Sequence, residues 1–177
     1  LGNILDFDTL TKENIYVLNS PILSNSQFNK FINFFGKNSV NIDCTFTQEE
    51  NLINAIKRIQ KEAEVAVRQG ITQIILSDKD LSSQKLPMPM LLCVGAINTF
   101  LIEKKLRGYV SINVQSGEAL DTHSFATLIG VGATTVNPYL AFDSLHQRHL
   151  KKLFGQFSFD ECVQRYIKSV NAGLLKI

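Results

Sequence analysis

Apolar positions along the chain follow two different periods after residue 40. Short runs that are apolar throughout or at every second residue are typical of strands, and apolar residues three and four positions apart are typical of helices. The strand-like runs cover residues 40–46, 73–76, 110–114 and 134–137, and the helix-like stretches cover 47–69, 90–107, 123–129, 138–145 and 159–170. This alternation predicts right-handed βαβ units and a parallel sheet. The predicted fold class is α/β, with an incomplete (half) β/α-barrel-like parallel sheet, although a small open sheet fits the same pattern.

The first part of the chain differs from this regular part. Its opening residues are polar and mixed, and the apolar run 17–23 contains a proline, which allows at most an edge strand. Residues 25–35 have the apolar spacing of a helix. We expect a single domain over residues 1–177, with an irregular or helical lead-in at 1–39 and repeated β/α units at 40–177.

Short-range signals predict where helices begin and end. A Ser or Thr followed three residues later by Glu forms a capping box, which satisfies the first free N–H groups of a helix. Such pairs occur at Thr47 with Glu50 and at Ser158 with Glu161. Two helices are expected to end at Gly70 and Gly108, because glycine readily adopts the left-handed conformation that closes a helix.

Composition and charge exclude several classes of protein. The 177 residues are 45% hydrophobic and 19% charged, and 18 basic against 16 acidic side chains leave a net charge of +2. This balance predicts no nucleic-acid partner, and no apolar stretch is long enough to predict a membrane span. Cys44, Cys93 and Cys162 have no metal-ligand spacing and are expected to be free thiols of a cytoplasmic protein. The first residue, Leu1, suggests an excised domain or a processed product.

Candidate chemistry lies in the loops that follow the predicted strands, where parallel α/β proteins place functional residues. The candidates are Asp78, Lys79, Ser116, Gly117, Glu118, His123 and Asn137. One interpretation makes Asp78 or Glu118 a general base with Lys79 as its electrostatic partner, and His123 lies within reach of Glu118. The other is structural, with the carboxylates capping helices and tying loops together. The structural interpretation is favoured and no catalytic residue is assigned, because no nucleophile and base occur at a recognised spacing.

No metal or cofactor site is predicted from the residues. His146 and His149 lie three positions apart, but no third ligand accompanies them. The glycines at 130 and 132 precede a predicted strand and do not follow one, so they do not form a dinucleotide-binding fingerprint.

Several stretches resemble the central domain of the glutamate synthase large subunit. They are residues 20–25, 74–78, 87–96, 116–126, 128–141 and 169–176, and Ser-Gly-Glu-Ala at 116–119 and Val-Asn-Pro-Tyr-Leu-Ala at 136–141 are the strongest. Their order and spacing match along essentially the whole chain. The resemblance implies a connecting domain whose fold is an incomplete α/β barrel.

The resemblance also implies a cytoplasmic oxidoreductase of ammonia assimilation, which makes glutamate from glutamine, 2-oxoglutarate and an electron donor. In that family an amidotransferase domain has an N-terminal cysteine nucleophile, and a separate barrel carries FMN and an iron–sulfur cluster. Ammonia passes between these two domains, and the central domain helps to frame the passage. The resemblance therefore implies that this fragment holds no cofactor and contacts both catalytic domains.

The chain departs from the family pattern at three places. Lys79 replaces an arginine, Gln115 replaces an acidic residue, and residues 98–100 replace a histidine-rich stretch. These departures favour a structural and coupling domain that is inactive alone. The alternative is a stand-alone small α/β enzyme or ligand-binding module that uses the loops at the strand ends.

The predicted helix over residues 90–102 is apolar on nearly all sides. A helix of this kind is expected to be buried on more than one side. For the fragment alone we therefore predict self-association, unless residues 1–35 fold back over the exposed face.

Overall fold

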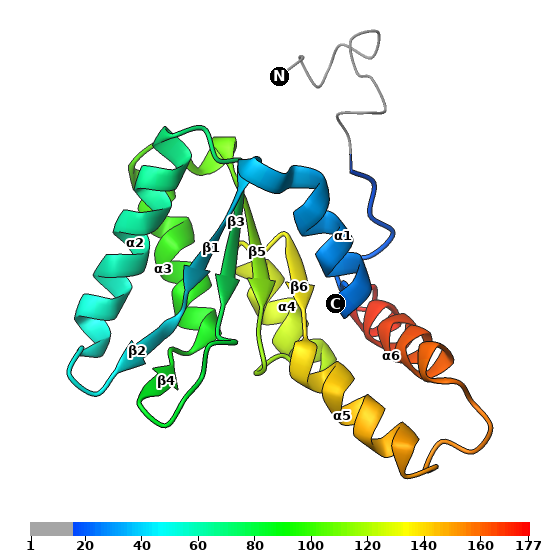
Figure 1. The fold of residues 1–177 in the computed structure, drawn as a ribbon. Helices are drawn as coiled ribbons and strands as arrows, with labels where there is room; N and C mark the ends of the chain where they lie inside the picture. Colours follow the sequence, from blue (N-terminus) through cyan, green and yellow to red (C-terminus); the bar gives the residue numbers. More distant parts are fainter. Residues whose placement is uncertain (1–15) are drawn as a thin grey trace, which may run out of the picture.

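A four-stranded parallel sheet lies at the centre of the computed structural model, which describes residues 16–177 (Figure 1). Its strands are β1 (Ser39–Asp43), β3 (Gln73–Ser77), β5 (Ser111–Gln115) and β6 (Thr135–Asn137), in the order β1-β3-β5-β6. A helix follows each strand before the next one begins, so the predicted α/β, half-barrel-like arrangement is confirmed. Parallel pairing brings all four carboxyl ends to one edge of the sheet, where the candidate loops lie.

Helices cover both faces of the sheet. They are α1 (Asn25–Phe35), α2 (Leu52–Arg68), α3 (Met90–Glu103), α4 (Thr122–Gly130), α5 (Tyr139–Leu150) and α6 (Phe159–Leu174), with short 3-10 turns η2 (Gly36–Asn38) and η3 (Arg107–Tyr109). The main core joins Ile74, Ile112 and Val136 of the sheet to α2, α3, α4 and α6. A second, smaller core joins Ile75 to Phe28 and other residues of α1 on the opposite face. The two cores follow from the alternation of side chains along each strand.

The segment before α1 lies against the outer edge of β6. Ile22 forms a single parallel bridge with Val136, and the Val136 N–H donates to the Pro21 carbonyl at 2.8 Å. A proline can occupy this place because only its carbonyl is needed, as a hydrogen-bond acceptor, and no backbone N–H is required there. The expectation of at most an edge strand at 17–23 is confirmed, and so is the helix at 25–35. The part of the lead-in at residues 1–15 lies outside the described residues.

The capping box predicted at Thr47 and Glu50 is wrong. Thr47 belongs to the short strand β2 (Thr45–Thr47), which pairs antiparallel with β4 (Lys85–Pro87). Helix α2 begins later, where the Asn51 side chain accepts a hydrogen bond from the Asn54 N–H at 2.9 Å. The pairing of β2 therefore competes successfully with the local capping signal, and the run predicted over 40–46 is divided between β1 and β2.

Other helix boundaries agree with the sequence only in part. The capping box at Ser158 and Glu161 is confirmed at the start of α6. The helix predicted over 90–107 ends at Glu103, because Lys105 and not Gly108 takes the left-handed conformation, with φ 59°. Helix α5 continues to Leu150, beyond the predicted end at 145. Among the described residues no helix has the length and apolar character needed to cross a membrane.

Candidate functional site

The carboxylate of Asp78, at the end of β3, is bound inside the protein by the loop that follows β5. It accepts hydrogen bonds from the Ser116 hydroxyl at 2.6 Å and from the Gly117 N–H at 3.0 and 3.1 Å. Only 2% of Asp78 is exposed. A buried charge needs such donors, because an unpaired carboxylate in an apolar interior is strongly unfavourable. Asp78 thus ties two strand-end loops together.

Glu118 is exposed and has a different role from Asp78. Its carboxylate accepts a hydrogen bond from the Met90 N–H at 2.9 Å, at the first residue of α3. The residue before Met90 is Pro89, whose side chain forms no capping hydrogen bond. A carboxylate at this place satisfies a free N–H and interacts favourably with the helix dipole. Glu118 therefore acts as the cap of α3, supplied from another loop.

Gly117 and Tyr139 pack closely beside Asp78. A Cβ atom at Gly117 would lie 3.0 Å from the Tyr139 hydroxyl oxygen, which is tighter than ordinary contact. Burial, followed by the nearby charge of Asp78, raises the pKa of Tyr139. The Lys79 ammonium lies 5.9 Å from the centroid of the Tyr139 ring. Lys79 forms no ion pair with a carboxylate in the described part of the chain, so the predicted electrostatic partnership is absent there.

Asn137 and His123 are not part of this cluster. The Asn137 amide nitrogen donates to the Leu23 carbonyl at 3.0 Å and to the Asn25 side chain at 2.9 Å. The Asn137 side chain therefore binds the start of α1, while its backbone carbonyl accepts from the Ser116 N–H at 3.1 Å. His123 is exposed near the start of α4, and within residues 16–177 no hydrogen bond joins it to Glu118. The sequence candidates are thus divided among separate places.

A row of polar side chains crosses the face of the sheet that α1 covers, and sequence reasoning missed it. The Ser77 hydroxyl donates to Gln115 at 3.0 Å, and Gln115 donates to Asn137 at 3.1 Å. These three residues are direct partners in the register of β3, β5 and β6. The signal was present in the polar residues that alternate with the apolar ones in residues 111–115. Gln115, one of the departures from the family pattern, is the centre of this row.

A second polar row lies one step back along the same strands. Asn113 is fully buried, donates to Gln73 at 3.0 Å and accepts from the Thr135 hydroxyl at 2.8 Å. Within the described residues every buried side-chain nitrogen and oxygen has a hydrogen-bond partner. Both rows are therefore satisfied internally, which gives them a role in fixing the order of the strands.

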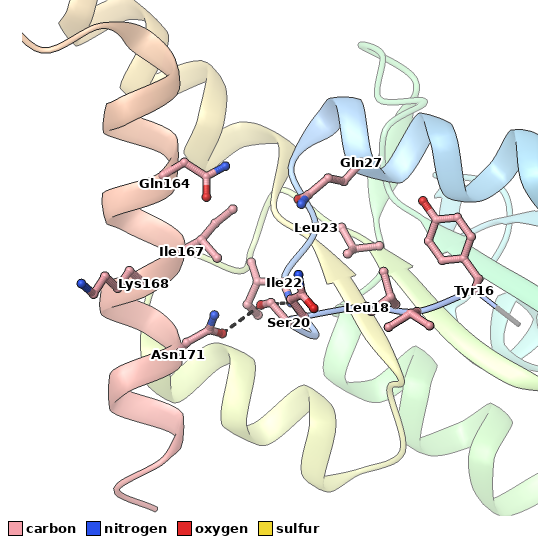
Figure 2. A pocket seen from close by; sticks show the side chains of 12 residues that line it. Tyr16, Leu18, Ser20, Ile22, Leu23, Gln27, Gln164, Ile167, Lys168 and Asn171 are labelled. Atoms are coloured by element: carbon pink, nitrogen blue, oxygen red, sulfur yellow. Dashed lines mark hydrogen bonds between the residues drawn. The ribbon is translucent and has the colours of Figure 1, made fainter. Parts of the chain in front are cut away.

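Two pockets lie away from the strand ends. The first, of about 340 Å³, is bounded by residues 16–23, α1 and α6. Figure 2 shows Gln164 of α6 facing it, Lys168 pointing away from it, and Asn171 bonded to the Ser20 hydroxyl at 2.9 Å. The second, of about 640 Å³, is lined mainly by apolar residues such as Ile129 and Leu174. Neither pocket is lined by a strand-end candidate, so the convergent pocket expected of a stand-alone enzyme is not found at these sites.

The possible metal ligands are also separated. Within residues 16–177, no group of three or more His, Cys, Asp or Glu side chains could hold a metal ion. His146 and His149 both pack against the Phe159 ring, at 5.0 and 6.1 Å between centroids. The three cysteines are free and buried, as expected. The neighbouring Cys93, together with burial, raises the pKa of Cys44, which opposes formation of a reactive thiolate.

These residues define a parallel α/β domain whose strand ends are occupied by structural ties. The buried carboxylate of Asp78 is bound by donors of the protein itself, the Ser116 hydroxyl and the Gly117 N–H. The model of the glutamate synthase central domain family matches residues 1–177. The chain belongs to this family.

Individual relatives agree with the family match. The chain is 43% identical over 180 residues to the glutamate synthase [NADPH] large chain of Azospirillum brasilense, covering 100% of this chain and 12% of the relative. The corresponding protein of Bacillus subtilis is 41% identical over 162 residues, covering 90% and 10%. A ferredoxin-dependent glutamate synthase of Pyropia yezoensis is 36% identical over 193 residues, covering 99% and 12%. The chain thus spans about a tenth of the length of these relatives.

Proposed function

We propose that this chain is the structural and coupling domain of a glutamate synthase, which links the amidotransferase and FMN domains and catalyses no step itself. The observation that carries this proposal is the use of Asp78. It stands where parallel α/β enzymes place catalytic groups, yet three hydrogen bonds from Ser116 and Gly117 engage it. With only 2% of Asp78 exposed and its carboxylate engaged by the protein, little of it is accessible to a substrate.

The surface around the strand ends supports contact with neighbouring domains. Four large apolar side chains are exposed there, on two loops, strand β4 and helix α5: Leu81, Leu86, Leu120 and Leu140. Exposed apolar groups that gather beside a functional edge are typical of interaction surfaces. We infer that the amidotransferase and FMN domains cover this surface, which places the ordered strand-end loops beside the ammonia passage.

The proposal assigns the cofactors of the whole enzyme, FMN and an iron–sulfur cluster, to other domains. An iron–sulfur cluster needs several cysteine thiolates around one site. The described residues do not fit this requirement, because the cysteines do not form a group of three or more ligands. The free thiols support a reducing compartment such as the cytoplasm.

The coupling role can be tested in the full-length enzyme. The double variant Leu120→Asp with Leu140→Asp places charges on the proposed interface without altering a buried residue. We expect glutamine hydrolysed per glutamate formed to rise several-fold, because ammonia escapes at a loosened contact. Ile53→Asp, on an exposed position of α2, is the matched control and should leave the ratio unchanged. A ratio that stays normal in a folded double variant would contradict the proposal.

The absence of catalysis in the domain itself can be tested separately. The purified chain should bind no flavin and form no glutamate from glutamine, 2-oxoglutarate and a reductant. A yellow protein with stoichiometric flavin would contradict this assignment and favour the stand-alone enzyme.

A further inference from the structure

The hairpin between α5 and α6 projects beyond the sheet. In α5 only Ala141 and Phe142 are buried, and both belong to its first turn. The helix then continues away from the carboxyl end of β6 and returns through a loop to α6 (Figure 1). We call residues 144–157, the outer part of this hairpin, the basic tip. Most of it contributes nothing to the core, so packing inside the domain does not explain its sequence.

Three large apolar side chains are exposed within eight residues of the basic tip. Their exposed fractions are 60% for Leu150, 64% for Leu153 and 41% for Phe157. The backbone around them is ordered by hydrogen bonds, including the Lys152 N–H to the His149 carbonyl at 2.8 Å. Single exposed apolar residues are common on protein surfaces, whereas several on one ordered projection indicate a contact surface.

The charges of the basic tip all have the same sign. Arg148, Lys151 and Lys152 are exposed, and no acidic residue lies between Asp143 and Asp160. This excess of three exceeds the net charge of +2 of the whole chain. In the described part of the chain these cations form no ion pair, since all five ion pairs lie between residues 43 and 85. The cations of the tip are thus free to pair with an external surface.

The position of Phe157 reinforces this combination of charge and apolar area. The guanidinium of Arg165, on the neighbouring helix α6, lies 4.1 Å from the centroid of the Phe157 ring. Such a cation–π contact orients an aromatic ring that is partly exposed. Exposed apolar side chains next to cations on one short segment fit a docking surface, in which apolar contacts supply affinity and charges supply orientation.

We propose that the basic tip docks into an acidic, apolar-centred surface on another domain of the same polypeptide. This rests on the proposed function, in which the chain is one domain of a long enzyme. The relatives are about ten times longer than this chain, and a domain tethered in the same polypeptide has a high effective concentration. Three apolar side chains give too little buried area for stable membrane binding, since even one acyl chain binds only marginally. The three cations of the tip are too few to indicate a nucleic-acid partner, since such binding depends on many phosphate contacts.

The test is lysine reactivity in the full-length enzyme. Acetylation of Lys151 and Lys152 is compared with that of Lys30 and Lys37, which are exposed on α1 and η2, each rate normalised to the unfolded enzyme. We expect protection of the tip lysines by at least about tenfold. Carbodiimide cross-linking should join them to Asp or Glu outside this domain, in products that keep the mass of one polypeptide. Equal reactivity of all four lysines would overturn the proposal.

Variants and alternative partners sharpen the test. Lys151→Glu with Lys152→Glu should raise hydrogen exchange over residues 150–157 several-fold, whereas Lys30→Glu with Lys37→Glu should not. Cross-links to a second polypeptide, or binding of the enzyme to phosphatidylserine vesicles or RNA that the tip variant abolishes, would overturn the assignment. Reactive tip lysines in an enzyme with a normal glutamine-to-glutamate ratio would overturn the tip proposal alone and leave the coupling function intact.

Discussion

At the scale of single residues, Asp78 lies where parallel α/β proteins place functional groups, and donors of the protein itself engage its carboxylate. Replacing it with Ala leaves the Ser116 hydroxyl and the Gly117 N–H without their partner. We expect a loss of about 1–3 kcal/mol in the free energy of unfolding, because buried polar groups that lose their partner are costly. Chemical denaturation of the purified chain measures this. The control Asp80→Ala, at an exposed neighbouring position, should change stability by less than about 0.5 kcal/mol. An Asp78→Ala variant as stable as the parent would mean that the hydrogen bonds of Asp78 do not stabilise the domain.

Asp43 gives a second prediction at this scale, for the dependence of stability on pH. Burial tends to raise its pKa, but hydrogen bonds from Thr45 and Lys85 outweigh burial, and the pKa of Asp43 is lowered below its usual 3.8. A carboxyl with a lowered pKa stabilises the folded state above its unfolded pKa, and this contribution is lost as the pH falls through the folded value. Stability should therefore decline below about pH 4.

The variant Asp43→Asn should show a smaller decline over the same pH range. Urea denaturation between pH 2.5 and pH 6 follows the difference between the two proteins. Asp80→Asn is a suitable control, since this exposed carboxyl forms no ion pair among the described residues. A decline of the same size in Asp43→Asn and in the parent would show that other carboxyls determine it.

The residues around the strand ends could be predicted from the sequence, but their partners could not. Their position after a predicted strand singled out Asp78 and Glu118 as candidates, and both carboxylates accept hydrogen bonds from groups of the protein itself. Two partners of the Asn137 side chain lie more than a hundred residues earlier in the chain, at Leu23 and Asn25. Such contacts depend on which segment covers the sheet, and periodicity along one strand carries no information about that.

At the scale of elements, one arginine joins three segments at the opposite end of the sheet. Arg107 donates to the Asn98 side chain at 2.6 Å, to the Val110 carbonyl at 2.6 Å and to the Gly132 carbonyl at 2.9 Å. It therefore connects α3, the start of β5 and the turn before β6. Asn98, one of the departures from the family pattern, packs closely on Gly132. A Cβ atom at Gly132 would lie 2.5 Å from the side-chain oxygen of Asn98.

Two glycine substitutions should consequently have opposite effects. Gly132 has φ 121°, so Gly132→Ala combines backbone strain with a collision against Asn98 and should destabilise by about 2–4 kcal/mol. Gly95 lies inside α3 with open space around the added methyl group, and Gly95→Ala should stabilise by about 0.5–1 kcal/mol. Thermal melts of the two variants and the parent give the comparison. Destabilisation by Gly95→Ala would indicate that α3 packs against a further surface.

The order of elements was predictable, whereas several of their ends were not. Helices α1 and α6 begin where the sequence indicates. Each begins with a capping box whose residues do not belong to a strand. The box at Thr47 is lost because β2 pairs with β4, a contact between segments about forty residues apart. Lys105 ends α3 although glycine is the usual residue for that conformation. Local signals thus decide a boundary only where tertiary pairing does not compete.

At the scale of the whole molecule, the half barrel has unequal edges. The edge beyond β6 is covered in part by the bridge from Ile22, and α1 covers part of one face. In the described residues β1 pairs only with β3 in the main sheet, so its other edge is open. The expectation that residues 1–35 fold back is therefore met in part by α1, while residues 1–15 lie outside the described residues.

The outer face of α3 carries the last prediction. Leu91, Leu92 and Ile102 are each more than two-fifths exposed on this helix, so the rest of the described chain does not cover it on all sides. That another surface covers it stays a prediction. The purified chain should self-associate through this face, burying at least roughly 1,000 Å² as a specific contact requires. Sedimentation velocity from low to high micromolar concentration should show a dimer that the triple variant Leu91→Ser, Leu92→Ser and Ile102→Ser abolishes. The control Leu175→Ser with Ile177→Ser, at exposed positions near the end of the chain, should leave the dimer intact. A parent chain that stays monomeric throughout would mean that these side chains need no partner outside the complete enzyme.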